Sequence, residues 1–258
     1  MTRMVDLNCD MGESFGAWKM GDDKNVINHI SSANVACGFH GGDPRIMEKT
    51  VGLAKSLGVG VGAHPGFPDL VGFGRRNIEV SPDEARTDVL YQIGALQGFC
   101  KKFGVALQHV KPHGQLNNLA MHDAVLAEAI VKGVKDFDSH LIVVAYGGQL
   151  AKVAEREGMR VAYEVFADRE YNADGTLVSR RIPGSVITDA DRIMRRAVRM
   201  VKEGEVESID GTTLNLKVHT ICVHGDTPGA AALVAALRRG FAEEGISVVP
   251  MSRILGED

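Results

Sequence analysis

The chain has 258 residues, of which 45% are hydrophobic and 24% are charged, and its formal net charge is −4 at pH 7. This length fits one large α/β domain, so residues 1–258 are expected to form a single β/α barrel. The modest negative charge and the lack of basic runs interleaved with aromatic residues argue against nucleic acid and membrane surfaces as partners. No apolar run is long enough to span a bilayer, and the four cysteines form no C-x-x-C pair, so a cytoplasmic protein with reduced cysteines is expected.

Short apolar runs alternate with amphipathic stretches along the chain, a pattern typical of repeated β-α units and a parallel sheet. Seven strands are predicted, near residues 4–9, 33–38, 59–63, 106–111, 140–145, 160–166 and 219–223. Helices are predicted at 44–57, after the capping box Ser81-Pro82-Asp83-Glu84, and at 124–134, 149–157, 189–202 and 228–244. Polar insertions are expected near 168–185, with a hairpin turn at Asn172–Gly175, and near 204–217.

Nearly every predicted strand ends in ionisable side chains. A buried parallel strand normally reads as a continuous apolar run, and burying a carboxylate or imidazole there is costly unless the group is paired. Side chains two residues apart share a face, so the polar residues of each strand line one face and the aliphatic residues mostly line the other. The simplest geometry is an irregular seven-stranded barrel with the polar face toward its axis. One shared site is then expected at the carboxyl ends of the strands.

Two features suggest the chemistry of this site. Arg75 and Arg76 stand next to glycines in a loop after the third strand, where guanidinium groups can fork around a carboxylate or phosphate. Asp10 with His40, His64 and His113 could hold a divalent metal, although no spacing among them is diagnostic. The chain has no G-x-x-x-x-G-K-[ST] loop, so any ATP that is used is not bound by a P-loop of this chain.

Seven blocks of the sequence resemble the signature blocks of the LamB/YcsF family. They are Val5–Glu13, Asn34–His40, Gly62–Gly66, Gly72–Arg76, His109–Gly114, Glu164–Arg169 and Cys222–Asp226, in that order. The resemblance implies an irregular seven-stranded β/α barrel related to the glycoside hydrolase/deacetylase class. It also implies a part in ATP-dependent hydrolysis of 5-oxoproline (pyroglutamate) to L-glutamate, with ADP and phosphate as the other products, together with 5-oxoprolinase subunits B and C.

The residues at the strand ends can be given roles in such a reaction. Asp10 or Glu13 is expected to be the general base, with a pKa raised by burial and by neighbouring carboxylates. Lys111 would stabilise the developing negative charge, and His113 or His224 would protonate the departing nitrogen. The residues expected to bind substrate or anions are Arg75, Arg76, Arg169, Asp6, Asn8, Asn34, His40, His64, Glu164, Asp168 and Asp226. The alternatives are an accessory subunit that only binds ligand, and a metal-dependent deacetylase-like hydrolase.

Overall fold

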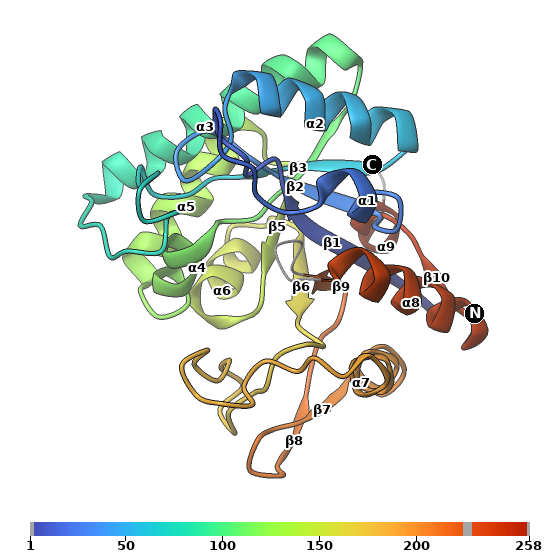
Figure 1. The fold of residues 1–258 in the computed structure, drawn as a ribbon. Helices are drawn as coiled ribbons and strands as arrows, with labels where there is room; N and C mark the ends of the chain where they lie inside the picture. Colours follow the sequence, from blue (N-terminus) through green and yellow to red (C-terminus); the bar gives the residue numbers. More distant parts are fainter. Residues whose placement is uncertain (1–2, 224–228, 257–258) are drawn as a thin grey trace.

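The computed structural model describes residues 3–223 and 229–256, and its centre is a closed barrel of parallel strands (Figure 1). Within the described residues the barrel order is β1 (Arg3–Met11), β2 (Ser32–Ala36), β3 (Gly60–His64), β4 (Leu107–Val110), β5 (Ile142–Ala145), β6 (Val161–Val165) and β9 (Thr220–Val223). β9 pairs with both β6 and β1, which closes the ring. The seven predicted strands and the predicted fold class are confirmed. That the whole chain folds as one domain stays a prediction.

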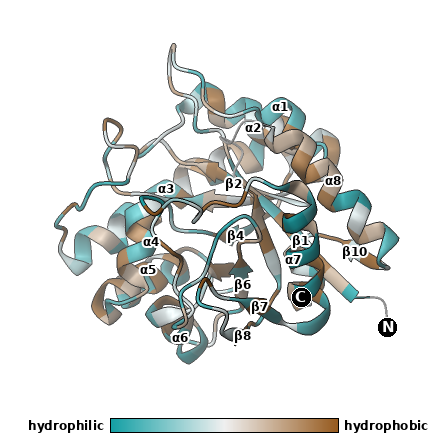
Figure 2. Cartoon of the chain, turned by 60° about the horizontal axis from the view of Figure 1, so that its bottom comes forward, coloured by the Kyte–Doolittle hydropathy of each residue, from teal (hydrophilic) through white to brown (hydrophobic). Residues whose placement is uncertain are grey.

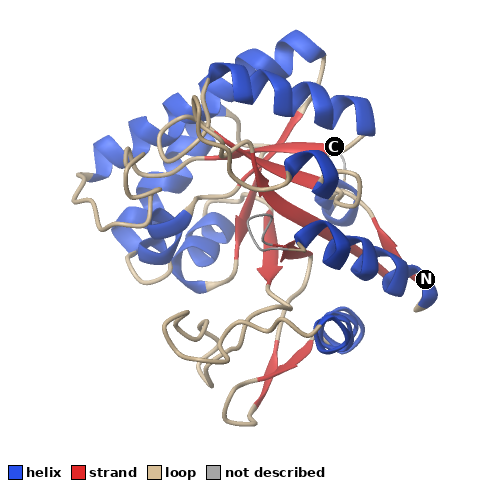
Figure 3. Ribbon diagram, viewed as in Figure 1, coloured by secondary structure: helices blue, strands red, loops and turns tan. Residues whose placement is uncertain are grey.

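Helices surround the barrel, as Figure 3 shows in blue around the red strands. The larger ones are α2 (Pro44–Leu57), α3 (Pro82–Phe103), α5 (Ala124–Phe137), α6 (Gly148–Arg156), α7 (Ala190–Glu203) and α8 (Ala230–Glu243), and the short ones are α1 (Asp23–Val26) and α4 (Gly114–Ala120). The predicted capping box on α3 is present, because the Ser81 hydroxyl accepts from the Glu84 amide and the Glu84 carboxylate accepts from the Ser81 amide. None of the helices of the described residues is both long and apolar enough to cross a membrane.

The two faces of each strand differ in polarity, as the period of two predicts. On β1 the side chains of Leu7 and Met11 are fully buried in the apolar core that the strands share with the helices. Asp6 and Asn8 on the other face are also fully buried, but they bond to groups from neighbouring strands. The interior of the barrel is therefore a hydrogen-bonded polar network rather than an aliphatic core.

The last elements of the chain close one end of the barrel and were not predicted. β10 (Ile246–Val248) pairs with the first half of β1, and α9 (Met251–Leu255) follows it. Met251 packs against Ile142, Val144 and Ala162, which are the inward-facing apolar residues near the start of β5 and β6. The amino-terminal end of the barrel is thus plugged, and the carboxyl-terminal end carries the polar groups.

The segment between β6 and β9 projects from one side of the barrel (Figure 1, orange). Its first part, near 168–185, folds back on itself: Tyr171 bridges Leu177, and a turn forms at Asn172–Gly175 where the hairpin turn is predicted. α7 follows, with its visible turns mostly hydrophilic in Figure 2. The second insertion contains the antiparallel hairpin of β7 (Glu205–Glu207) and β8 (Thr213–Asn215).

The buried carboxyl group of Asp6 gives a testable stability effect. Burial raises its pKa from 3.8 to about 6, although hydrogen bonds from Ser32, Thr220 and Ser31 partly offset this. An acid with a raised folded-state pKa stabilises the fold fully below its unfolded pKa, and this contribution is lost as the pH rises through the folded value. As the pH rises from about 4 to about 7, ionisation of Asp6 should lower the unfolding free energy of the wild type by up to about 3 kcal/mol. We expect Asp6→Asn to abolish this fall, because an amide does not ionise. Urea unfolding across this range would check it, and parallel pH curves for the two proteins would contradict it.

Candidate active site

A pocket of about 640 Å³ opens at the carboxyl ends of the barrel strands. Its floor contains Asp10 from β1, Glu164 from β6 and Cys222 from β9, together with Lys111, which directly follows β4. The phenol of Tyr146 and the ring of Phe166 lie edge to face, with centroids 5.9 Å apart, and form an apolar part of the wall. One shared site is what the polar strand ends predict. The structure brings seven of the predicted residues into this pocket, namely Asp10, His64, Arg75, Lys111, His113, Glu164 and Arg169, whereas Glu13 and His40 are not among its lining residues.

Lys111 is the centre of the floor and is only 4% exposed. Its ammonium lies 2.9 Å from Asp10 Oδ1 and 2.8 Å from Glu164 Oε1. It also lies 3.2 Å from the Cys222 sulfur. Because a thiol sulfur is a weak acceptor, this N–H is the one that a substrate oxygen can most easily take over. Glu164 Oε2 is buried and has no hydrogen-bond partner among the described residues, so the floor offers a ligand both a donor and an acceptor.

Three histidines and Glu13 gather on the β1–β4 side of the rim. One ligand atom from each of Glu13, His40, His64 and His113 lies within 4.8 Å of the others. The rings of His40 and His113 are stacked with centroids 3.6 Å apart, and His64 stands perpendicular to both. Gly74 makes this packing possible, since a Cβ there would lie 2.8 Å from both His40 and His113 and its φ is +61°.

Backbone carbonyls fix the tautomers of two of these rings. His64 Nδ1 lies 2.6 Å from the Lys111 carbonyl oxygen, and His113 Nε2 lies 2.8 Å from the Phe73 carbonyl oxygen. A carbonyl oxygen only accepts, so both of these nitrogens carry a proton. In neutral rings the lone pairs of His64 Nε2 and His113 Nδ1 then face one another at 3.0 Å. Asp10 Oδ2 lies 3.3 Å from His64 Nε2, and Glu13 Oε1 lies 3.6 Å from His113 Nδ1. Four acceptors converge here, and only a proton or a metal cation between them relieves the repulsion.

The electrostatics correct one expectation about the carboxylates. Desolvation pushes the pKa of Asp10 upward, but the neighbouring charges of His64 and Lys111 outweigh it and hold that pKa well below its usual range. The expectation of a raised pKa is therefore wrong for Asp10, which stays ionised. Burial lowers the pKa of His113 to about 3, and His64 adds to the effect. Burial likewise lowers the pKa of His40 well below its usual value.

Not every predicted site residue reaches the pocket. Asp6 lies deeper in the barrel, and the amides of Asn8 and Asn34 form a layer beneath the floor, where Asn34 bonds Asp10 and Asn8. Arg76 points away: it pairs with the buried carboxylate of Asp69 and lines a separate hollow. Asp168 is buried beside Arg169 and does not line the pocket. His224 and Asp226 lie outside the described residues.

The structure also adds residues that the sequence did not single out. Tyr146 follows β5 and lines the pocket, but its strand end carries no charged residue to draw attention. Arg180 and Arg181 reach the pocket from the 168–185 insertion. The sequence feature that could have indicated these two arginines is the length of that insertion, since long loops in compact domains are often functional.

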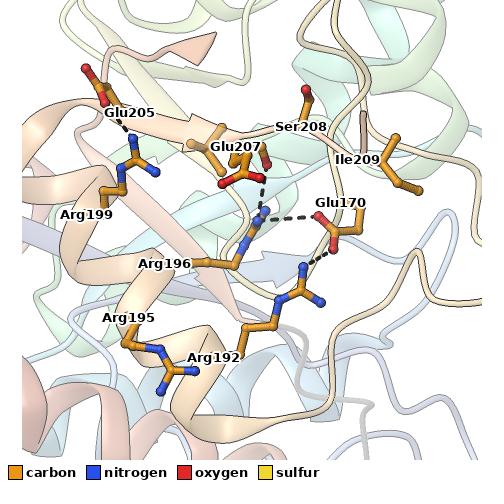
Figure 4. Close-up of a pocket in the computed structure, with 10 residues that line it drawn as sticks. Glu170, Arg192, Arg195, Arg196, Arg199, Glu205, Glu207, Ser208 and Ile209 are labelled. Carbon is orange, nitrogen blue, oxygen red and sulfur yellow. Dashed lines mark hydrogen bonds and ion pairs between the residues drawn. The ribbon is translucent and has the colours of Figure 1, made fainter. Parts of the chain in front are cut away.

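A second pocket, of about 530 Å³, lies between α7 and β7, away from the strand ends (Figure 4). Its guanidinium groups are largely neutralised within the chain: Arg192 and Arg196 pair with Glu170, and Arg199 pairs with Glu205. Arg195 is drawn without a partner and is exposed. These contacts attach the second insertion to α7, and no converging acid–base groups accompany them among the described residues.

Comparison with known proteins agrees with the fold and identifies the family. The LamB/YcsF family pattern matches residues 5–256. A protein of Thermococcus onnurineus that is named as the A subunit of 5-oxoprolinase is 55% identical over 252 residues, which cover 97% of this chain and 99% of that protein. The crystal structure of a lactam utilization protein from Thermus thermophilus is 48% identical, with a TM-score of 0.92 over 95% of this chain and 99% of that one.

A more distant likeness concerns the fold alone. The structure of T48 deacetylase with substrate is 15% identical, with a TM-score of 0.52 over 98% of this chain and 90% of that chain. It supports the deacetylase-like barrel that the sequence predicts and carries no argument about chemistry. Since the family pattern spans nearly the whole chain and the relatives match at about half of their positions, this chain belongs to the LamB/YcsF family.

Proposed function

We propose that this chain is the A subunit of an ATP-dependent 5-oxoprolinase, a cytoplasmic hydrolase that opens 5-oxoproline to L-glutamate together with subunits B and C. The observation that carries the proposal is the pocket floor, where buried Lys111 stands between two carboxylates beside a cluster of histidines. The names of close relatives support the substrate and the partner subunits. The missing P-loop supports a role for the partners in using ATP.

The chemical difficulty is the amide of the five-membered ring, which is stabilised by resonance and has a poor leaving group. ATP supplies the energy to activate the amide oxygen, so that the ring carbon becomes a better electrophile. The residues of this chain fit the second half of the reaction, in which water attacks that carbon and the C–N bond breaks.

The pocket can place each reacting group. Lys111 stabilises negative charge on the substrate oxygen when its N–H leaves the Cys222 sulfur. Glu164 Oε2 accepts a hydrogen bond from the ring nitrogen of the lactam. Asp10 stays ionised and holds Lys111 and His64 in place. Glu13, at the histidine cluster, accepts the proton of the attacking water and passes it through His113 Nδ1 to the departing nitrogen.

The test is reconstitution with the two partner subunits. We expect glutamate and ADP to form from 5-oxoproline and ATP only when all three chains are present. A pre-activated lactam mimic, given to this chain alone, separates the enzyme from an accessory subunit: turnover supports catalysis here, and binding without turnover supports the accessory role. A complete complex that hydrolyses no 5-oxoproline would overturn the proposal.

The four converging acceptors favour a second proposal, that the cluster holds a divalent metal. Glu13, His40, His64 and His113 fit as ligands, with Asp10 at the edge. Metal–nitrogen bonds of about 2.0–2.1 Å place tetrahedral ligands roughly 3.3 Å apart. The atoms here are 3.0 Å apart for His64 and His113 and 3.3 Å apart for His40 and Glu13. When bound, such an ion lowers the pKa of a water molecule and polarises a carbonyl.

Metal binding can be measured without activity. We expect the metal-free chain to take up one equivalent of Co²⁺ with a visible absorption band, and His64→Ala to weaken binding by at least about 100-fold. His140→Ala is the matched control, because His140 is exposed and pairs only with Asp138. The metal proposal would be contradicted if the wild-type chain took up no Co²⁺, or if lactam hydrolysis continued in full after complete metal removal. The cation shared by the cluster would then be a proton.

A further inference from the structure

The insertion at 168–185 forms an ordered wall over the pocket. Arg169 bridges Val186 on one side, and Glu170 exchanges backbone hydrogen bonds with Val178 and Ser185. The connection between Val178 and Ser185 carries Arg180 and Arg181, and it contains a turn from Ser179 to Ile182. The wall thus places three arginines along one side of the pocket.

Arg169 is a buried donor that is not satisfied. Its residue is 7% exposed, and its Nη2 donates to the Val178 carbonyl oxygen at 2.7 Å, which fixes the guanidinium. Its Nε is buried without a hydrogen-bond partner among the described residues. An unpaired buried donor costs about 1–3 kcal/mol, more when it is charged, so a ligand that accepts from it gains that energy.

The neighbouring charges have the same sign. Burial lowers the pKa of Arg169, and the positive charge of Arg180 acts in the same direction. Asp168 offsets only part of this. The side chains of Arg180 and Arg181 form no ion pair with the described residues, unlike Arg192, Arg196 and Arg199 of α7 in Figure 4. These three guanidinium groups of the wall have N–H donors and positive charge that the described residues do not pair, which suits the wall to binding an oxyanion.

The strand order places this wall opposite the histidine cluster. Glu13, His40, His64 and His113 follow or end β1 to β4, and the insertion follows β6. β6 is separated from β3 by β4 and β5 in one direction and by β9, β1 and β2 in the other. In 5-oxoproline the ring carbon that bears the carboxylate and the reacting carbonyl carbon flank the ring nitrogen on opposite sides. A lactam whose nitrogen lies at Glu164 can therefore direct its carbonyl to the histidines and its carboxylate to the arginines.

We propose that Arg169, Arg180 and Arg181 form a clamp for the free carboxylate of the lactam and make the site selective for the free acid. This inference rests on the proposed function, and it assigns the recognition of the acid to a segment outside the barrel strands. Arg75 also lines the pocket, and it lies on the histidine side, where its charge acts on His113.

The experiment compares two substrates in the reconstituted complex: 5-oxoproline, and 5-oxoprolinamide, which has the same ring without the negative charge. We expect the double variant Arg180→Ala, Arg181→Ala to lower kcat/KM for 5-oxoproline by about 10- to 100-fold, mostly through KM. The KM of the amide, or its inhibition constant if it is not turned over, should change less than about twofold. Arg180→Lys with Arg181→Lys keeps the charge and should recover part of the loss. Arg195→Ala removes an exposed arginine of α7 that forms no ion pair with the described residues, and it should have no effect.

The outcomes separate the two proposals. A wild-type complex without 5-oxoprolinase activity overturns the proposed function itself. An active wild-type complex with an unaffected double variant overturns the clamp alone. Equal losses with acid and amide also overturn it, because the arginines would then serve the phosphoryl group or the fold. If 5-oxoprolinamide neither reacts nor inhibits, the test uses 5-oxoproline alone. A double variant with a lower kcat and an unchanged KM for 5-oxoproline would then contradict the clamp.

Discussion

Lys111→Ala is expected to slow lactam hydrolysis by about 100- to 1000-fold in the assembled complex, because it removes a preorganised donor from the oxygen that gains negative charge. The ammonium is buried and is held by Asp10 and Glu164, so no free energy is needed to orient it during the reaction. The measurement is the rate of glutamate formation at saturating 5-oxoproline and ATP. A loss of less than about threefold would remove Lys111 from the mechanism.

The same variant leaves Asp10 and Glu164 without their shared cation, which destabilises a fold by about 3–5 kcal/mol. Thermal unfolding followed by circular dichroism shows whether the chain remains folded at the assay temperature. Ethylammonium added to Lys111→Ala can occupy the space that the side chain leaves, and we expect it to restore part of the rate. Lys102→Ala, which breaks a surface pair with Glu48, is the matched control and should change neither rate nor stability appreciably.

Glu13→Gln is expected to lower the rate by about 100- to 10,000-fold, because an amide cannot take a proton from the attacking water. Glu13 Oε1 lies 3.3 Å from His40 Nε2 and 3.6 Å from His113 Nδ1, and His113 lines the pocket. Glutamate formation measured over a range of pH checks both the rate and the loss of the acid limb of the profile. Glu79→Gln changes an exposed carboxylate and should behave as wild type.

Metal titration distinguishes two reasons for such a loss. If Glu13 acts only as a ligand, the variant binds Co²⁺ more weakly and regains activity at saturating metal. If Glu13 is the base, activity stays low when the site is filled. Recovery of more than about half of the wild-type rate at saturating metal would contradict the base assignment, since a lost proton acceptor costs at least about 100-fold.

The barrel and the charged groups of the pocket floor could be predicted because both depend on the period of two in strands. Asp6, Asn8 and Asp10 alternate with buried aliphatic residues on β1, and this phase alone places them on the barrel axis. β10 has only three residues, which is too short a run to distinguish from a loop. The sequence could therefore indicate which end of the barrel is functional, but it did not show what closes the other end.

The errors concern contacts that no local pattern encodes. Arg75 and Arg76 are adjacent, yet only Arg75 lines the pocket, because Asp69 in the same loop binds Arg76. Burial alone predicts a raised pKa for Asp10, and the opposite result depends on His64 and Lys111, which lie far away in sequence. Arg180 and Arg181 stand in an insertion without periodicity, so nothing in the sequence fixes the direction of their side chains.

The closure of one barrel end by α9 has a consequence for substrate entry and product release. In the described part of the chain, Met251 and its apolar neighbours fill the far end, and the pocket opens at the carboxyl ends of the strands. Under the proposed function, lactam would enter and glutamate would leave through this same opening. A partner chain docked over it would have to withdraw before glutamate could leave, and the rate of turnover would then depend on the lifetime of the docked complex.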